Sequence, residues 1–274
     1  MKILLPRCRK KCLVIIGNSI ESWIVSLVTF SRKVNKMDYK ISIIIRTYNE
    51  SKHIEEVLKS LLKQSYRNFE VILVDSESTD NTVETAEKYD VRIIKIKKKD
   101  FNYSYSSNIG CEKATGDLLC FLSGHSVVAN DDYLILANNI FQNQEIGGCY
   151  GDVVALVDGS WIEKLFNYLG YIKNKVKGTE IKLESQIHPG ILSCSNALVR
   201  KTLWDKHKFK EELGKGGEDV ELAYRIIQEG YYVAKAPALL VKHSHGSGFI
   251  KFIKEFNGWR AMYDVVLKYI ETNK

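Results

Sequence analysis

Short aliphatic runs alternate with helical patterns from residue 37 onward, and this alternation most limits what the chain can fold into. Four of the five residues at 41–45 are isoleucine, which is typical of a parallel strand buried on both faces. Apolar residues then recur at helical spacing from Ile54 to Leu62. Further strands are expected at 71–74, 91–96 and 117–122, with helices at 82–89 and 104–114. This order predicts an α/β fold with a mainly parallel central sheet flanked by helices.

The pattern is less regular after residue 128, but it continues to mix helices and strands. We expect helices at 131–142, 160–174 and 218–229, and an amphipathic helix at 249–271. Strands are expected at 191–199 and 231–236.

The charge of the chain is concentrated at its amino end. The sequence has 40 Lys and Arg against 33 Asp and Glu, a formal charge of +7. Residues 1–36 hold eight of the bases and the single acid Glu21, so residues 37–274 are balanced. A main body without net charge argues against nucleic acid as a partner.

The apolar stretch at 13–30 contains Asn18 and Glu21, and it fits a basic amphipathic helix on an anionic membrane surface better than a membrane span. Translation starting at Met37 is the alternative, in which case the extension has no role. The six cysteines include no CxxC pair, which favours reduced thiols in a cytosolic protein.

Polar residues follow the expected strands where each strand ends. Ligands of parallel α/β sheets gather beyond the carboxyl ends of the strands. Thr47 and Asn49 follow the first strand, Asp75 and Ser76 the second, and Ser123 and His125 the fourth. The sequence has no GxGxxG and no GxxxxGK[ST], so bound phosphate is most simply held by a metal. Asp75 could accept a hydrogen bond from a base or ribose, or could equally cap a helix.

Five segments in order resemble family-2 glycosyltransferases of the GT-A fold over about residues 39–246. They are IIIRTYNE at 43–50, VDSESTDNT at 74–82, the set NIG at 108–110, ATGD at 114–117 and FLSGH at 121–125, GGED at 216–219, and KHSHG at 242–246. The nearest group is the bacterial cell-surface polysaccharide type, and Ser-Gly-His stands where the family usually has Asp-x-Asp. The resemblance implies a nucleotide-binding half at about 39–128 and an acceptor half at about 129–248. Together these form a catalytic domain at 37–248, preceded by the extension at 1–36 and followed by a helix at 249–274.

The resemblance also implies roles for individual residues. A divalent cation, Mn²⁺ or Mg²⁺, would be held by His125 and by His243, with His245 as the alternative to His243; imidazole favours manganese. Asp219 would be the general base of an inverting transfer and Glu218 its neighbour, although both could merely cap a helix. The nucleotide would be lined by Thr47, Asn49, Glu50, Asp75, Ser76, Asn108 and Ser123, of which Glu50 and Asn108 could instead organise loops. Ser195, Asn196 and Gly217 would line the donor or acceptor pocket.

The expected reaction moves a sugar from a nucleoside-diphosphate sugar to a hydroxyl of a lipid-linked or growing surface glycan. UDP-sugars are the favoured donors and dTDP-rhamnose the second. The enzyme would be cytoplasmic and peripheral on the inner face of the cell membrane. A nucleotidyltransferase would need glycines after the first strand, and a catalytically inactive sugar-nucleotide-binding scaffold is the other competitor.

Overall fold

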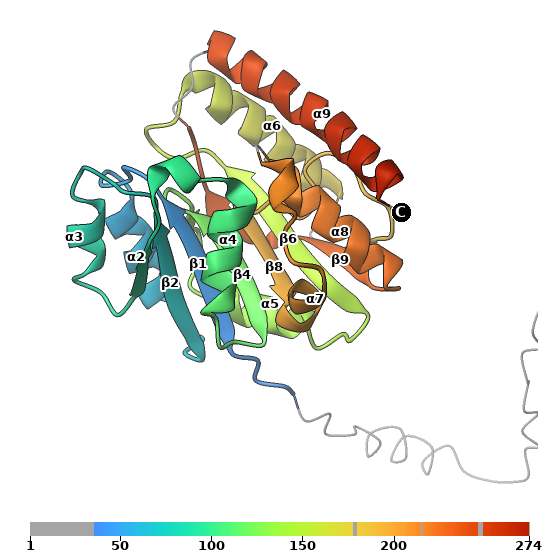
Figure 1. Ribbon diagram of the computed structural model, residues 1–274, viewed down its shortest axis with the longest axis horizontal. Coiled ribbons are helices and arrows are strands. Elements are labelled where there is room, and N and C mark those ends of the chain that lie inside the picture. The colour runs from blue at the N-terminus through green and yellow to red at the C-terminus, as the bar shows by residue number, and fades with distance from the viewer. Residues whose placement is uncertain (1–35, 178–179, 215, 246–248, 274) are drawn as a thin grey trace, which may run out of the picture. The chain divides into compact units, whose positions relative to one another are not determined.

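The computed structural model describes residues 36–177, 180–214, 216–245 and 249–273 (Figure 1). Residues from Met37 onward form one compact unit. The expected amphipathic helix at 13–30 lies outside the described residues.

A parallel half-sheet forms the first part of this unit. It consists of β1 (Ile41–Thr47), β2 (Phe69–Asp75), β3 (Arg92–Lys95) and β4 (Leu118–Ser123), in the order β3-β2-β1-β4. β1 pairs in parallel with β2 and β4, so that Thr47 is in register with Asp75 and Arg46 with Ser123. The expected parallel arrangement is confirmed here, and the register brings the polar strand ends to one edge.

The sheet continues into a mixed half, in the order β4-β8-β6-β9-β5 with β7 beside β9. The strands are β5 (Val127–Val128), β6 (Ile146–Val154), β7 (Lys182–Glu184), β8 (Asn196–Arg200) and β9 (Tyr232–Lys242). β6 and β9 are parallel, whereas β8 runs antiparallel to both β4 and β6. The mainly parallel arrangement therefore applies to the first half only.

Two sequence expectations in this half are corrected. The strand expected at 191–199 begins at Asn196, because residues 191–195 turn: Ile191 N donates to His188 O and Asn196 N donates to Ser193 O. β6 was not expected at all, since its three glycines weaken the strand signal.

Helices cover both faces of the sheet (Figure 1). α2 (Ile54–Leu62) and α5 (Tyr133–Ile140) share one apolar cluster with Ile41, Ile43 and Ile45. α4 (Tyr103–Glu112), α7 (Lys201–His207), α8 (Glu218–Gln228) and α9 (Phe249–Thr272) share the opposite cluster with Ile44. α3 (Thr82–Ala86), α6 (Trp161–Lys177) and the 3-10 turns Lys98–Asp100 and Glu211–Leu213 complete the described elements.

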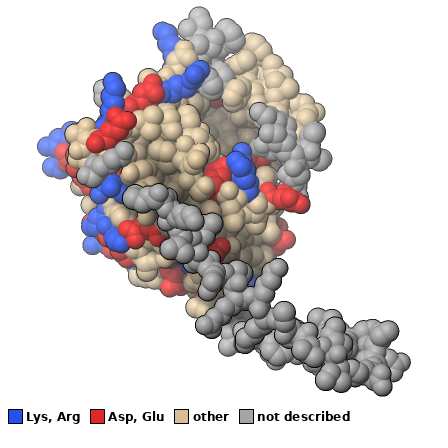
Figure 2. Space-filling view, turned by 90° about the vertical axis from the view of Figure 1, so that its right-hand side faces the viewer, with Lys and Arg blue, Asp and Glu red and all other residues tan. Residues whose placement is uncertain are grey.

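The surface drawn in Figure 2 carries interspersed basic and acidic side chains, in line with the balanced charge of residues 37–274. None of the helices within the described ranges is both long and apolar enough to cross a bilayer.

Candidate active site

The carboxyl ends of β1 and β2 form a buried polar group. The Asp75 carboxylate, 1% exposed, accepts from Thr47 Oγ1 at 3.0 Å and from the Ser78 N–H at 2.9 Å. Ser76 Oγ is buried and has no hydrogen-bond partner among the described residues. Asn49 has a left-handed backbone (φ 55°), and its side chain accepts from the Thr79 N–H at 2.8 Å. Three of the residues expected at a nucleotide, Thr47, Asp75 and Ser76, thus lie together.

Asn108 and Asn196, in contrast, have their side chains fully engaged inside the protein. Asn108 Nδ2 donates to Phe209 O and Glu211 Oε1, both at 3.0 Å, and its Oδ1 accepts from the Trp204 ring N–H. Asn196 Nδ2 donates to Asp152 O and Leu239 O, and its Oδ1 accepts from the Tyr133 hydroxyl. The Asn108 side chain joins α4 to residues 209–211, and the Asn196 side chain joins β8 to β6 and β9. We therefore leave both out of the proposed ligand contacts.

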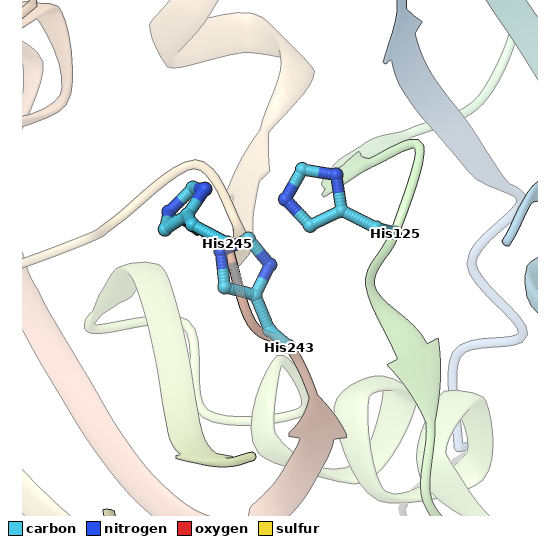
Figure 3. Close-up of side chains that lie close together, drawn as sticks. All are labelled: His125, His243 and His245. Atoms are coloured by element: carbon cyan, nitrogen blue, oxygen red, sulfur yellow. Dashed lines mark hydrogen bonds between the residues drawn. The ribbon is translucent and has the colours of Figure 1, made fainter. Parts of the chain in front are cut away.

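Three histidines converge beside this edge (Figure 3). His125 follows β4, and His243 and His245 follow β9. One ring nitrogen from each lies within 4.8 Å of those of the others. His125 Nε2 is buried without a partner among the described residues, and the Nε2 atoms of His243 and His245 are 3.2 Å apart. An ion that binds imidazole nitrogens at about 2.1 Å holds two of them roughly 3 Å apart, which matches the 3.2 Å between the Nε2 atoms of His243 and His245. The three rings together offer a set of nitrogen donors that suits a divalent cation.

The protein fixes the opposite nitrogen of two of these rings. His125 Nδ1 is 2.8 Å from Glu50 Oε1, and His243 Nδ1 is 3.1 and 3.0 Å from Ser123 Oγ and Ser126 Oγ. Such contacts orient a histidine so that its other nitrogen faces a metal. Glu50 and Ser123, expected at the nucleotide, therefore contact the histidines in this structure.

Local backbone features hold the cluster in place. A Cβ on Gly124 would approach Glu50 Cγ to 2.6 Å, so a glycine allows Glu50 to reach His125. The backbone N–H of His245 donates to Glu163 Oε1 at 2.9 Å. Burial, followed by the neighbouring histidines, lowers the pKa of His243 well below its usual range, which keeps its ring neutral and available as a ligand.

The carboxylate pair opens α8. Gly217 precedes it with a left-handed backbone (φ 84°), and a Cβ there would collide with Val266 of α9. Glu218 is 4% exposed, and its Oε1 is 3.4 Å from Arg46 Nη1 at the end of β1. Arg46 thus links the first half of the sheet to the carboxylate pair.

Asp219 has an unusual proton affinity. Burial and then the adjacent charge of Glu218 raise its pKa to about 7, although the Val220 N–H, Arg46 and the Cys194 N–H act in the opposite direction. A helix amino end alone would favour the ionised carboxylate, but burial outweighs that effect at Asp219. A carboxyl group with a pKa near neutrality suits a general base.

One loop connects the carboxylates to the histidines. The Cys194 N–H donates to Asp219, and Ser195 O accepts from Ser126 Oγ at 3.0 Å. Ser126 Oγ in turn contacts His243 Nδ1. Ser195 therefore lies between the two groups of candidate residues. Cys194 itself is a buried free thiol whose pKa is raised by burial, so the thiolate that a nucleophile needs is disfavoured.

Two contacts of the site were not foreseen from the sequence, namely Arg46 with Glu218 and Ser126 with His243. His245, expected only as the alternative to His243, lies in the cluster together with it. The alternation of side chains along extended backbone places residues 243 and 245 on one side, which was the available signal for His245.

A family model described as Glycosyl transferase family 2 matches residues 42–207. The O-antigen chain rhamnosyltransferase RfbN of Salmonella typhimurium is 27% identical over 209 residues, which cover 75% of this chain and 67% of that protein.

Two solved structures are similar in fold. The mannosyltransferase PcManGT from Pyrobaculum calidifontis, in complex with GDP-Man and Mn²⁺, matches with a TM-score of 0.56 at 20% identity, covering 82% of this chain and 64% of that chain. TarS of S. aureus in complex with UDP matches with a TM-score of 0.58 at 21% identity, covering 75% of this chain and 60% of that chain. The chain thus spans between 60% and 67% of the length of these three proteins.

Proposed function

Since the chain belongs to glycosyl transferase family 2, we propose that it is an inverting glycosyltransferase that moves a sugar from a nucleoside-diphosphate sugar to a hydroxyl of a surface glycan. The similarity to the solved structures confirms the expected α/β fold of GT-A type. The observation that carries the proposal is the position of one loop, 193–196, between the histidine cluster and the carboxylate Asp219.

The nucleotide lies at the ends of β1 and β2 in this proposal. Asp75 would accept a hydrogen bond from the base, and the unpartnered Ser76 hydroxyl and the side chains of Thr47 and Asn49 would surround it. A UDP-sugar is the favoured donor, in view of the UDP bound to TarS. dTDP-rhamnose is the second, in view of the rhamnosyltransferase relative.

His125, His243 and His245 would hold a divalent cation. The Nε2 of His125, which has no partner in the described part of the chain, and the convergence of the rings support this assignment. A cation at this place supplies a Lewis acid that neutralises charge on the departing diphosphate. Three imidazoles suit Mn²⁺ and later transition ions better than Mg²⁺, which prefers oxygen ligands.

Asp219 would take the proton of the acceptor hydroxyl. As that O–H bond breaks, the acceptor oxygen forms a bond to the anomeric carbon from the side opposite the diphosphate, whose bond to the same carbon breaks. A single displacement of this kind inverts the anomeric configuration. Glu218 keeps the pKa of Asp219 high enough for proton transfer, and Arg46 holds Glu218 in place.

The acceptor in this proposal is a lipid-linked glycan at the cytoplasmic face of the cell membrane, where the protein is peripherally bound. We also propose the division of the chain expected from the sequence, with an extension at 1–36, a nucleotide-binding half at about 39–128 and an acceptor half at about 129–248.

A panel of sugar nucleotides tests the proposed reaction. We expect slow release of nucleoside diphosphate from one donor, accelerated by Mn²⁺ and abolished by a chelator. Binding of a sugar nucleotide with no turnover in the presence of acceptor extracts would instead identify an inactive scaffold. Release of pyrophosphate from a nucleoside triphosphate and a sugar phosphate would identify a nucleotidyltransferase.

A further inference from the structure

α6 presents an apolar stripe to the outside of the molecule. Five of its exposed large side chains recur at helical spacing, so they lie along one side of the helix, and the exposed Phe166 (47%) lies beside them. The five are Trp161 (65% exposed), Leu165 (47%), Tyr168 (59%), Leu169 (58%) and Ile172 (38%), and we call them the α6 stripe. Few folded proteins expose so many large apolar residues on one helix without a partner surface.

The other side of α6 is the one that packs on the protein. Glu163 is 4% exposed, and its carboxylate accepts from Ser160 and from the backbone of His245. α6 also packs against β6 and lies alongside α9 (Figure 1). The exposed side chains of the α6 stripe are therefore not partly buried members of the hydrophobic core.

Exposed bases lie on α6 and on the first part of α9, and the exposed acid Asp264 lies further along α9. Lys164 is exposed on α6, and no acidic residue is exposed among the described side chains of that helix. The first part of neighbouring α9 exposes Lys251, Lys254 and Arg260. Clustered bases beside an apolar helical face with Trp and Tyr are the combination that binds anionic lipid interfaces.

We propose that the α6 stripe inserts into the surface of an anionic lipid bilayer, with the bases of α9 facing the lipid headgroups. This deepens and rests on the proposed transfer to a lipid-linked acceptor. Because Glu163, in the first turn of α6, accepts a hydrogen bond from the backbone of His245, insertion would hold the histidine cluster close to the headgroup layer. A hydroxyl carried by a short lipid-linked glycan would then meet the donor without leaving the membrane surface.

Cosedimentation of the full chain with phosphatidylglycerol-containing vesicles tests this surface. We expect L165E/L169E to lower the lipid partition coefficient by about tenfold or more, because two half-exposed leucines no longer leave water. The control is L62E, which alters an equally exposed leucine on α2 (52% exposed) and should bind like wild type. All three proteins carry residues 1–36, so a difference between them belongs to α6. The difference should persist at high salt, where attraction between charges is screened.

Brominated lipids give a second, local readout. Quenching of tryptophan fluorescence by vesicles should be smaller in W161F than in wild type, because Trp161 would sit among the acyl chains. Equal vesicle binding by L165E/L169E and wild type, or equal quenching in W161F, would overturn the proposal. So would a wild-type dimer that L165E/L169E separates into monomers, since the stripe would then be a protein interface. Donor hydrolysis measured without vesicles separates these outcomes from failure of the proposed transfer reaction.

Discussion

Replacing Asp219 with Asn is expected to lower turnover by about 10²–10⁴-fold while leaving nucleotide binding unchanged, because asparagine cannot accept the proton of the acceptor hydroxyl. The folded protein should become more stable near pH 8. The pKa of Asp219 is raised to about 7 in the fold, so ionisation opposes folding increasingly as the pH rises from about 4 to 7, and asparagine removes that penalty. Steady-state kinetics, nucleotide titration and thermal melting measure the three effects. D205N, which alters an exposed aspartate on α7, is the matched control. Wild-type turnover in D219N would remove this residue from the mechanism.

The pH profile supplies an independent readout of the same residue. We expect kcat/KM of the wild type to fall below about pH 7, tenfold per unit, as Asp219 becomes protonated. In E218Q the fall should move to lower pH, because the neighbouring negative charge is the second-largest cause that raises the pKa of Asp219. An unchanged midpoint in E218Q would contradict the coupling between the two carboxylates.

Loss of His243 is expected to abolish most of the Mn²⁺-dependent gain in nucleoside diphosphate affinity. His243 is 9% exposed, and its Nδ1 is held by two serine hydroxyls, so its Nε2 is fixed in the cluster, 3.2 Å from His245 Nε2. Calorimetric titration of Mn²⁺ and of the diphosphate in H243A measures this loss directly, without reference to activity. The same titration of H125A and H245A tells which rings share the ion.

Two comparisons make this result interpretable. E50Q keeps all three rings but weakens the contact that orients His125, and loss of such an outer partner costs about 10- to 100-fold in metal affinity. H243A should cost more than E50Q. H207A removes a histidine that pairs with Glu229 away from the cluster and should change nothing. Equal enhancement by Mn²⁺ in H243A and wild type would show that the cluster is not the metal site.

Much of the fold could be predicted because local patterns and tertiary structure agree. The isoleucines of β1 and the helical spacing of α2 indicate their elements without reference to the rest of the chain. β6 was not predicted because its glycines disfavour a strand locally. The surrounding structure nevertheless requires glycine there, since a Cβ on Gly147 or Gly151 would collide with packed residues of other elements. Only the folded context reveals that requirement.

The positions of candidate site residues could be predicted where a polar residue follows a strand or begins a helix, as with Asp75, His125 and the pair at 218–219. The contacts that tune these residues join distant parts of the chain. Glu50 and His125 are 75 residues apart, Ser126 and His243 are 117 apart, and Arg46 and Glu218 are 172 apart. No local pattern pairs such residues. For the same reason the sequence did not predict that burial would raise the pKa of Asp219.

The anomeric configuration of the released sugar tests the central claim most directly. Donor hydrolysis followed by proton NMR from its first minutes, before the free sugar equilibrates, needs no knowledge of the natural acceptor. The account predicts that the first sugar to accumulate has the configuration opposite to that of the donor, and that D219N forms it far more slowly. A first product with the configuration of the donor would contradict a single displacement with Asp219 as the base.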